Sequence, residues 1–189
     1  MSYFPAFIKL DNKKVLLVGG GNIALEKLEK LLDFTKEISL ISLEYSPEML
    51  ALIKEENLSY QVRAYRVGDI KESAIVIVAV DDIELQKEIF EESKEYKCLC
   101  NSVDSVEYCD FIFPSYVKKE ELTVAVSTSG SSPAFAKYFR MYLENLVPDG
   151  VSDFLKEMKA LRSSLPKGKE RMKMLDEKAK EYVSSWNKA

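Results

Sequence analysis

Short apolar runs rich in β-branched residues alternate with longer segments of helical periodicity over the first 113 residues. The runs have the length and composition of buried strands, and the segments between them place apolar residues three and four apart. This alternation predicts an α/β fold with a doubly wound parallel sheet, covered by helices on both faces. The expected strands are 15–18, 38–41, 60–63, 74–79 and 97–100, and the expected helices are 22–32, 47–55 and 83–94.

The pattern changes after Pro114, where one more strand is predicted at 122–127 and the residues beyond that strand are predicted to be helical. Ser132 and Pro133 favour a helix start, because a hydroxyl can cap the first turn and the fixed φ of proline suits it. The following helix has a wide aromatic face. Such a face is usually buried against another part of the protein or a second subunit, so we expect a homodimer. That face is formed by Phe135, Tyr138, Phe139, Tyr142, Leu143 and Leu146.

The composition excludes several classes of protein. With 189 residues, 47% hydrophobic and 31% charged, the chain can bury a core and remain soluble. No apolar run approaches the roughly 18 residues that a bilayer span requires, and the first residues lack the pattern of a secretory signal. We therefore expect a cytoplasmic protein with no membrane partner. A net charge of -4 argues against nucleic acid as a partner, since phosphate binding usually accompanies a basic balance.

The sequence contains no histidine, which excludes a Ser-His-Asp triad and any zinc site built on histidine. The three cysteines, Cys98, Cys100 and Cys109, lack paired C-x-x-C spacing. We therefore interpret them as structural thiols and expect no metal site. A proton acceptor in this chain is expected to be a carboxylate.

Three consecutive glycines lie between the first predicted strand and the first predicted helix. They fit the dinucleotide-binding pattern G-x-G-x-x-A, formed here by Gly19, Gly21 and Ala24. In this pattern the first glycine permits a tight turn, and the second lets a pyrophosphate approach the backbone. The small third residue lets the helix pack on the strand. The alternative is a tight strand-to-helix turn without a ligand.

Acidic side chains follow the second and fourth predicted strands. Glu44 is placed where a carboxylate can accept a hydrogen bond from a ribose hydroxyl, and its alternative is a solvated side chain. No arginine lies near Glu44 in the sequence, which favours NAD over NADP. Ala79, Val80 and Asp81 are expected beside the cofactor, whereas Asp82 is expected to cap the next helix.

Asn101 and Asp104 follow the fifth predicted strand, at the same edge of the sheet. The nicotinamide ring of a bound dinucleotide is expected near them. A carboxylate there is a natural proton acceptor, which makes Asp104 the candidate base. Its alternative is a turn residue that bonds its own backbone.

Three blocks of this sequence resemble the precorrin-2 dehydrogenase module of siroheme synthases, in its free-standing form. The opening FPAFIKLDNKKVLLVGGGNIALEKLEKLL is similar to the family's first strand, glycine loop and helix. CNSVDSVEYCDFIFPS resembles its Asn-x-x-Asp and Phe-Ile-x-Pro stretch. LTVAVSTSGSSPAFAKYFRMYLENLVP resembles its strand, Ser/Gly-rich turn and dimer-forming helix. Together with the aspartate pair after the fourth strand, the blocks cover most of residues 3–148.

The resemblance implies oxidation of precorrin-2 to sirohydrochlorin, with NAD as hydride acceptor, by a homodimer. Asp104 matches the family's essential aspartate, its general base. With the residues that match dinucleotide contacts, the predicted cofactor site comprises Gly19, Gly21, Asn22, Ile23, Leu43, Glu44, Ala79, Val80, Asp81 and Asn101.

The implied substrate carries many carboxylates, so we expect it at hydroxyls, backbone amides and basic side chains near the Ser/Gly-rich turn. The predicted contacts are Ser127, Thr128, Ser129, Gly130, Ser132, Lys137 and Arg140, with Lys118 and Lys119 as further candidates. The predicted parts are an NAD-binding Rossmann domain (1–113), a dimerisation and substrate-pocket region (114–148) and a helical C-terminal region (149–189). A separate methyltransferase is expected to supply precorrin-2.

Two other functions remain as alternatives. One is a non-enzymatic module that senses dinucleotides, which would not need the Asn101 to Asp104 loop. The other is a chelatase with a vestigial cofactor site. Insertion of iron into sirohydrochlorin also stays open as a second activity, in which Asp104 would accept pyrrole protons.

Overall fold

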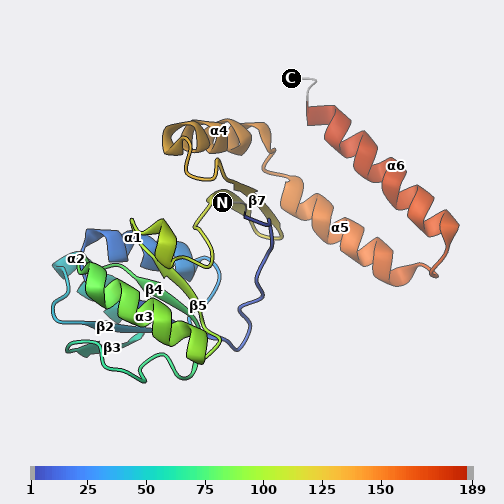
Figure 1. The fold of residues 1–189 in the computed structure, drawn as a ribbon. Coiled ribbons are helices and arrows are strands. Elements are labelled where there is room, and N and C mark those ends of the chain that lie inside the picture. Colours follow the sequence, from blue (N-terminus) through green and yellow to red (C-terminus); the bar gives the residue numbers. More distant parts are fainter. Residues whose placement is uncertain (1–2, 187–189) are drawn as a thin grey trace. The chain divides into compact units, whose positions relative to one another are not determined.

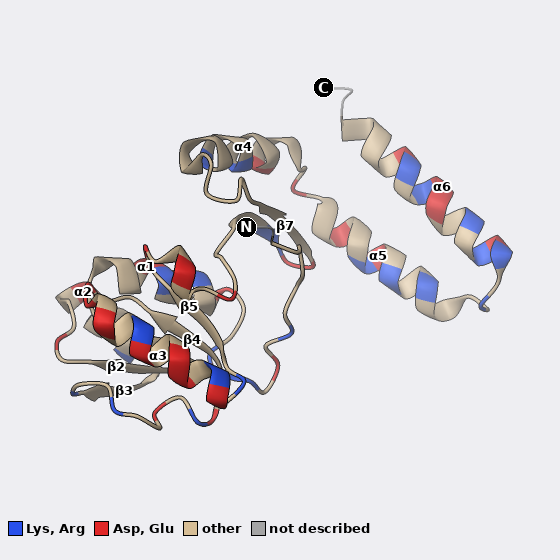
Figure 2. Ribbon diagram, in the orientation of Figure 1, with Lys and Arg blue, Asp and Glu red and all other residues tan. Residues whose placement is uncertain are grey.

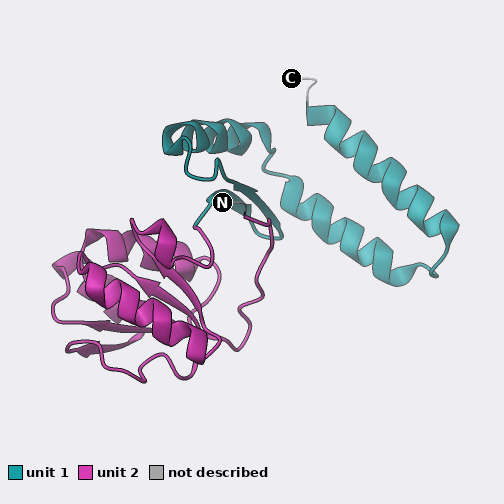
Figure 3. Cartoon of the chain, viewed as in Figure 1, with its two compact units in different colours: residues 1–2, 113–189 teal, residues 3–112 magenta. Residues whose placement is uncertain are grey.

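The computed structural model describes residues 3–186 of the chain. Contacts within the chain divide these residues into two compact units, 3–112 and those from Phe113 onward (Figure 3). The first unit contains the glycine turn and Asp104, and the second contains the Ser/Gly-rich turn. The finer boundary between residues 148 and 149 stays a prediction.

The first unit is built on a five-stranded sheet whose strands are all parallel, in the order β3-β2-β1-β4-β5 (Figure 1). The order reverses direction after β3, so β1 and β4 are neighbours and their carboxyl ends form the switch point of the sheet. This topology confirms the doubly wound α/β fold. The strands are β1 Lys14–Val18, β2 Ile38–Ser42, β3 Ser59–Val62, β4 Ser73–Val78 and β5 Leu99–Ser102.

Three helices connect these strands: α1 Asn22–Leu32, α2 Pro47–Glu55 and α3 Ile83–Glu95. Their bounds agree with the sequence prediction to within one residue. The side chain of Asp82 accepts a hydrogen bond from the Leu85 amide at 3.1 Å, which confirms Asp82 as the cap of α3. The cap satisfies one of the amides that a helix start leaves unpaired.

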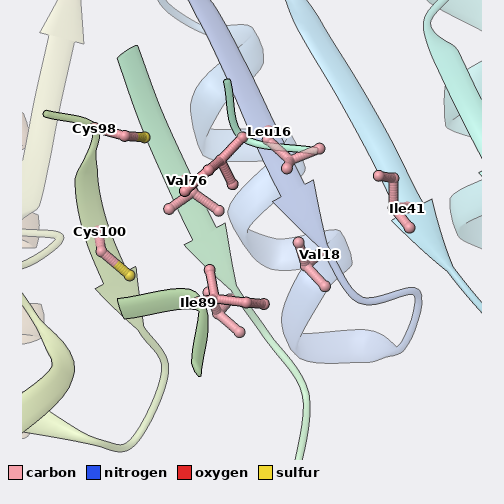
Figure 4. Packing of buried hydrophobic residues seen from close by; sticks show 9 residues of the cluster. Leu16, Val18, Ile41, Val76, Ile89, Cys98 and Cys100 are labelled. Carbon is pink, nitrogen blue, oxygen red and sulfur yellow. The ribbon is translucent and has the colours of Figure 1, made fainter. Parts of the chain in front are cut away.

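The core of the first unit lies on the faces of the central strands. Leu16 and Val18 of β1 and Val76 of β4 pack with Ile89 of α3 in one cluster (Figure 4). Residues alternate along a strand, so β1 turns its other side chains, Val15 and Leu17, to the opposite face, where they are also buried. A sheet buried on both faces explains why its strands are continuous apolar runs in the sequence.

Cys98 and Cys100 belong to this core, as expected for structural thiols (Figure 4). Burial raises the pKa of the Cys98 thiol to about 11 and that of Cys100 to about 12. Burial also raises the pKa of Cys109, which is only half-buried. At neutral pH all three side chains are therefore thiols rather than thiolates.

We expect native protein at pH 8 to react with iodoacetamide at Cys109 first, while Cys98 and Cys100 react only after unfolding. The reagent needs a thiolate, and a pKa of about 11 leaves roughly one Cys98 in a thousand ionised at this pH. Peptide mass spectrometry with and without denaturant measures the order. Rapid native labelling of Cys100 would contradict the buried core described here.

The fifth strand begins two residues later than predicted, at Leu99 instead of Lys97. The reason is the end of α3: Lys97 has φ +55, and the Cys98 amide donates to the Ser93 carbonyl at 2.9 Å. Lys97 in this left-handed conformation ends the helix. Lys97 and Cys98, which the apolar pattern had assigned to the strand, therefore belong to the turn that ends α3 instead. Asn101 consequently lies inside β5, with Asp104 in the loop that follows.

The second unit begins with an antiparallel hairpin of β6 Ser115–Lys119 and β7 Leu122–Val126. The sequence analysis predicted β7 but missed β6, because it assigned no element to residues 115–119. The hairpin turn consists of Glu120 and Glu121, and Glu120 takes the left-handed φ of +48. Glutamates are not typical of such a turn, so the sequence carried no hairpin signal.

Three helices follow: α4 Pro133–Leu146, α5 Val151–Ser164 and α6 Lys169–Ser185. The hydroxyl of Ser132 accepts from the Phe135 amide at 3.2 Å, which confirms the predicted start of α4. α5 and α6 pack against each other, and the rings of Phe154 and Tyr182 stack with centroids 3.9 Å apart. Between residues 3 and 186, no helix is both long enough and apolar enough to span a bilayer.

One face of α4 is aromatic and uncovered. Phe135, Phe139 and Tyr142 form a continuous stack, with ring centroids 5.7 and 6.3 Å apart. All three side chains are exposed, as is Tyr138. Figure 2 shows α4 as largely tan, in contrast to the bands of charge along α5 and α6. The sequence correctly placed these side chains on one face.

Candidate functional site

The first two glycines of the turn after β1 are required by close packing of three strand ends. A Cβ on Gly19 would lie 2.2 Å from the carbonyl oxygen of Ala79, and Gly19 has φ +126. A Cβ on Gly20 would lie 1.9 Å from the carbonyl oxygen of Glu44. The turn therefore holds the ends of β1, β2 and β4 together at the carboxyl edge of the sheet. The G-x-G-x-x-A pattern explains Gly19, but it leaves Gly20 unconstrained.

Gly21 has a different environment, because a Cβ there would meet no atom within 4 Å. It occupies the N-cap position of α1, which has no side-chain cap and no acidic residue in its first turn. The amides and positive end of a helix in this state suit an anion such as a pyrophosphate. Ala24 is fully buried, so α1 packs closely on the sheet. These features fit the pyrophosphate of a dinucleotide.

Apolar side chains are exposed along the same edge of the sheet. They belong to Ile23 at the start of α1, Leu43 after β2, Val62 at the end of β3 and Ile83 at the start of α3. Such side chains suit the flat faces of an adenine or a nicotinamide ring. Glu44 is also exposed and lies just after the end of β2, which is where an acidic residue can bind the ribose. The edge thus fits both the phosphates and the rings of a dinucleotide.

A pocket of about 210 Å³ lies within the first unit at the switch point. It brings together five predicted site residues from three different segments. The amide of Gln86 shapes its wall by donating to the Val80 carbonyl at 2.7 Å. The lining residues are Ile23, Ala79, Val80, Asp81, Ile83, Gln86, Val103, Asp104 and Ser105.

Asp104 contributes an exposed carboxylate to this pocket and has the left-handed φ of +64. Aspartate and asparagine tolerate this region better than other non-glycine residues, and such backbone is common at active sites. The Val103 amide donates to the Val78 carbonyl at 2.9 Å, which anchors the loop to β4. The loop therefore presents Asp104 beside the glycine-turn helix.

Lys27 lies one helical turn beyond Ile23, on the same side of α1. Burial and the neighbouring Lys30 lower the pKa of the half-buried Lys27 ammonium, while Glu26 and Asp104 raise it. Lys27 and Asp104 are therefore close enough to interact electrostatically. Lys27 therefore adds a positive charge near the carboxylate of the candidate base.

Asn101 is buried and does not line the pocket. Its side-chain amide donates to the Phe111 carbonyl at 2.8 Å and contacts the Cys109 sulfur at 3.5 Å. These bonds join the two ends of the loop that carries Asp104. In this structure its side chain supports the loop, and its predicted contact with the cofactor stays a prediction.

Replacing Asn101 with alanine is expected to cost about 1–3 kcal/mol of unfolding free energy, because the buried hydrogen bond to the Phe111 carbonyl is lost. The loop around Asp104 loses an anchor, so turnover should fall as well. Urea denaturation and steady-state rates of the same preparation measure both effects. Unchanged stability together with unchanged turnover would contradict a supporting role.

Comparison with known proteins agrees with this geometry. Residues 6–115 match a family model described as "Putative NAD(P)-binding", and this match covers more than half of the 189-residue chain. The chain belongs to this NAD(P)-binding family. The matched segment contains the glycine turn, all five parallel strands and Asp104.

Curated relatives of this NAD(P)-binding chain include siroheme synthases. One from Mannheimia succiniciproducens is 34% identical over 148 residues, which are 78% of this chain and 31% of that protein. Siroheme synthase 1 of Serratia proteamaculans is 37% identical over the same length, with 78% and 31% covered. The chain thus spans about a third of the length of these relatives.

Among solved structures, "SirC, precorrin-2 dehydrogenase" has the same fold. The two structures superpose with a TM-score of 0.76 at 20% sequence identity, over 99% of this chain and 100% of that one. The likeness therefore extends beyond the NAD(P)-binding segment to the hairpin and the C-terminal helices.

The residues predicted to bind substrate lie in the second unit. In the turn, Ser129 and Gly130 have φ of +51 and +84, and two of the hydroxyls accept hydrogen bonds from its own amides. The Ser127 hydroxyl accepts from the Ser129 amide at 3.0 Å, and the Thr128 hydroxyl from the Ser132 amide at 3.1 Å. The turn is therefore internally braced.

The basic candidates in this unit differ in their partners. Lys119 donates to the Val147 carbonyl at 2.7 Å and to Asp149 at 3.0 Å, so it ties the hairpin to the connection between α4 and α5. Arg140 pairs with Glu144 one turn along α4. Lys137 is exposed on the same helix. Within residues 3–186, no group of three or more Cys, Asp or Glu side chains is arranged to hold a metal ion.

Sequence reasoning missed three residues that shape this site. Gly20 is constrained by Glu44, Gln86 braces the pocket wall and Lys27 interacts electrostatically with Asp104. Helical periodicity could have linked Lys27 to Ile23, because the two are four residues apart. The other two depend on contacts between distant segments, which carry no local signal.

Proposed function

We propose that this chain is an enzyme that oxidises precorrin-2 to sirohydrochlorin, with NAD as the hydride acceptor. Membership of the NAD(P)-binding family supports the cofactor, and the named relatives and the SirC fold support the tetrapyrrole substrate. One observation carries the proposal: a single pocket places Asp104 beside Ile23 of the glycine-turn helix. A module that only sensed dinucleotides would not need a carboxylate there.

The reaction removes two electrons and two protons from precorrin-2. NAD, when bound, supplies the acceptor for a hydride, so one C–H bond breaks and NADH forms. The second proton leaves the macrocycle as its new double bond forms. We assign its acceptance to the carboxylate of Asp104, which passes it to solvent. The positive charge of Lys27 interacts electrostatically with Asp104.

We assign recognition of the substrate carboxylates to the second unit. The turn from Ser127 to Ser132 offers amides and hydroxyls, with Thr128, Ser129 and Gly130 between them. Lys137 and Arg140 add positive charge, which a protein of net charge -4 has to concentrate locally. Arg140 would exchange its exposed partner Glu144 for a substrate carboxylate, at small cost because surface ion pairs are weak.

We also propose that the working enzyme is a homodimer. The exposed aromatic stack of Phe135, Phe139 and Tyr142 on α4 supports this, because a face of this kind is rarely left in water.

The methyltransferase that makes precorrin-2 lies outside the 189 residues of this chain. Unpaired thiols at all three cysteines suit the reducing conditions of the cytoplasm, where we place the enzyme.

An anaerobic assay of purified protein with precorrin-2 and NAD tests the proposal. We expect NADH absorbance and the sirohydrochlorin spectrum to rise together, and neither to rise when NAD or precorrin-2 is omitted. Ferrous iron added afterwards to the same cuvette reports whether the chain also accelerates formation of siroheme. Tight NAD binding without any change in either spectrum would refute the dehydrogenase and favour a sensing module.

A further inference from the structure

An arginine lies beside the predicted ribose site, although none is near it in the sequence. Arg63 follows β3 directly, and its amide donates to the carbonyl of Ser42, the last residue of β2, at 2.9 Å. Glu44 is only two residues beyond Ser42. The expectation that no arginine lies near Glu44 therefore holds along the chain but is wrong in the folded structure. It matters because an arginine at this place is what accommodates the 2′-phosphate of NADP.

The guanidinium of Arg63 is already occupied, however. Its two terminal nitrogens donate to the two carboxylate oxygens of Asp69, at 2.7 and 2.8 Å. The remaining donor, Nε, bonds the side chain of Gln61 at 2.7 Å, and one terminal nitrogen also reaches the Ala64 carbonyl at 2.9 Å. A planar, two-point pair of this kind is stronger and more directional than an ordinary surface ion pair.

The pair is also held from the Asp69 side. The Arg66 amide donates to Asp69 at 2.8 Å, so the carboxylate is fixed to its own loop as well as to Arg63. The two side chains are only 21% and 15% exposed, which sets this pair apart from the more exposed ion pairs of the first unit. Arg63 cannot turn toward a ligand without removing both side-chain donors from the half-buried Asp69 carboxylate, which would keep only the Arg66 amide.

We propose that Asp69 is a specificity-determining residue that makes the site prefer NAD over NADP by sequestering Arg63. The proposal rests on the cofactor part of the proposed function, namely a dinucleotide whose ribose lies at Glu44. With Arg63 sequestered, the exposed Glu44 carboxylate is the charge that meets the 2′ position. It accepts a hydrogen bond from a hydroxyl and repels a phosphate. Asp69 thus acts through Arg63, without touching the cofactor.

The test compares binding of NAD and NADP to full-length variants by isothermal titration calorimetry. Asp69→Asn keeps an oxygen for the Arg66 amide but removes the charge that holds Arg63. We expect NADP affinity to rise about tenfold relative to NAD in this variant, while NAD affinity changes less than twofold. In the double variant Asp69→Asn with Arg63→Met, the affinity ratio should return to within twofold of wild type.

Glu72→Gln is the matched control, because Glu72 is an exposed carboxylate that pairs with Lys14 at the amino end of β1. It should leave the affinity ratio unchanged. An unchanged ratio in Asp69→Asn, or a gain that persists without Arg63, would overturn the proposal. If Asp69→Asn does not fold, Asp69→Ser takes its place, with the same expected rise in NADP affinity. Weaker NADP binding relative to NAD in the double variant would overturn the proposal, because Arg63 would then already serve the phosphate in wild type.

These measurements do not depend on precorrin-2. A protein that binds NAD and shifts its preference as expected, yet oxidises no tetrapyrrole, would refute the proposed reaction and keep the role of Asp69. A protein that oxidises precorrin-2 with NAD, but whose NAD-to-NADP affinity ratio does not change in the Asp69 variants, would support the proposed reaction and refute the role of Asp69.

Discussion

Asp104→Asn is expected to lower the turnover of precorrin-2 by about 10²–10⁴-fold, while NAD affinity stays within about twofold of wild type. Asparagine has the same size and tolerates the φ of +64, so the loop should keep its shape. What it loses is the ability to accept the proton that leaves the macrocycle. Steady-state kinetics with precorrin-2 and calorimetric titration with NAD measure the two quantities on one preparation.

Asp81→Asn is the matched control for this experiment. Asp81 is another exposed carboxylate that lines the same pocket, but it has no part in the proposed proton transfer. We expect its turnover to stay within about tenfold of wild type. If Asp104→Asn turned over normally, or lost NAD affinity and turnover by the same factor, Asp104 would not be the proton acceptor. Comparable losses in both variants would indicate a general electrostatic effect of the pocket.

Gly20→Ala is expected to unfold the nucleotide-binding edge, with a cost of several kcal/mol. Its Cβ would lie 1.9 Å from the Glu44 carbonyl oxygen, so the backbone of β1 or β2 has to move. Gly21→Ala, one residue further, meets nothing within 4 Å and should unfold like wild type. Its methyl group would instead occupy the space where the pyrophosphate approaches, so we expect NAD affinity to fall at least tenfold.

Thermal unfolding and NAD titration of the two variants separate these effects. The structure predicts a large fall in melting temperature for Gly20→Ala alone and a loss of cofactor with intact stability for Gly21→Ala. Equal stability of the two proteins would contradict the packing of the turn. Normal NAD affinity in Gly21→Ala would mean that the pyrophosphate does not approach at this residue.

Much of the fold was predictable because its signals are local. The first helix and the cap at Asp82 follow from side-chain periodicity and from the chemistry of one helix start. Strand β6 was missed because Glu120 and Glu121 make a turn that only pairing with β7 reveals. Strand β5 was misplaced by two residues because Lys97 ends α3 in a left-handed conformation, which lysine gives no reason to expect.

The candidate site was predictable to the extent that parallel strands bring their carboxyl ends together. That rule placed Asp81 and Asp104 in one region, and the resemblance to the family added Ile23. A single pocket contains all three. The contact of Arg63 with Ser42 continues the parallel pairing of β2 with β3. The rule could not reveal that Asp69 occupies the Arg63 guanidinium, because that contact depends on the path of the loop after β3.

The most direct test of the account is a single-turnover experiment, in which excess enzyme and NAD are mixed anaerobically with a known amount of precorrin-2. We predict one NADH and one sirohydrochlorin for each precorrin-2 consumed, appearing at one rate, with both signals lost in Asp104→Asn. Formation of sirohydrochlorin without NADH, or NADH formation that Asp104→Asn leaves unchanged, would contradict a hydride transfer assisted by Asp104.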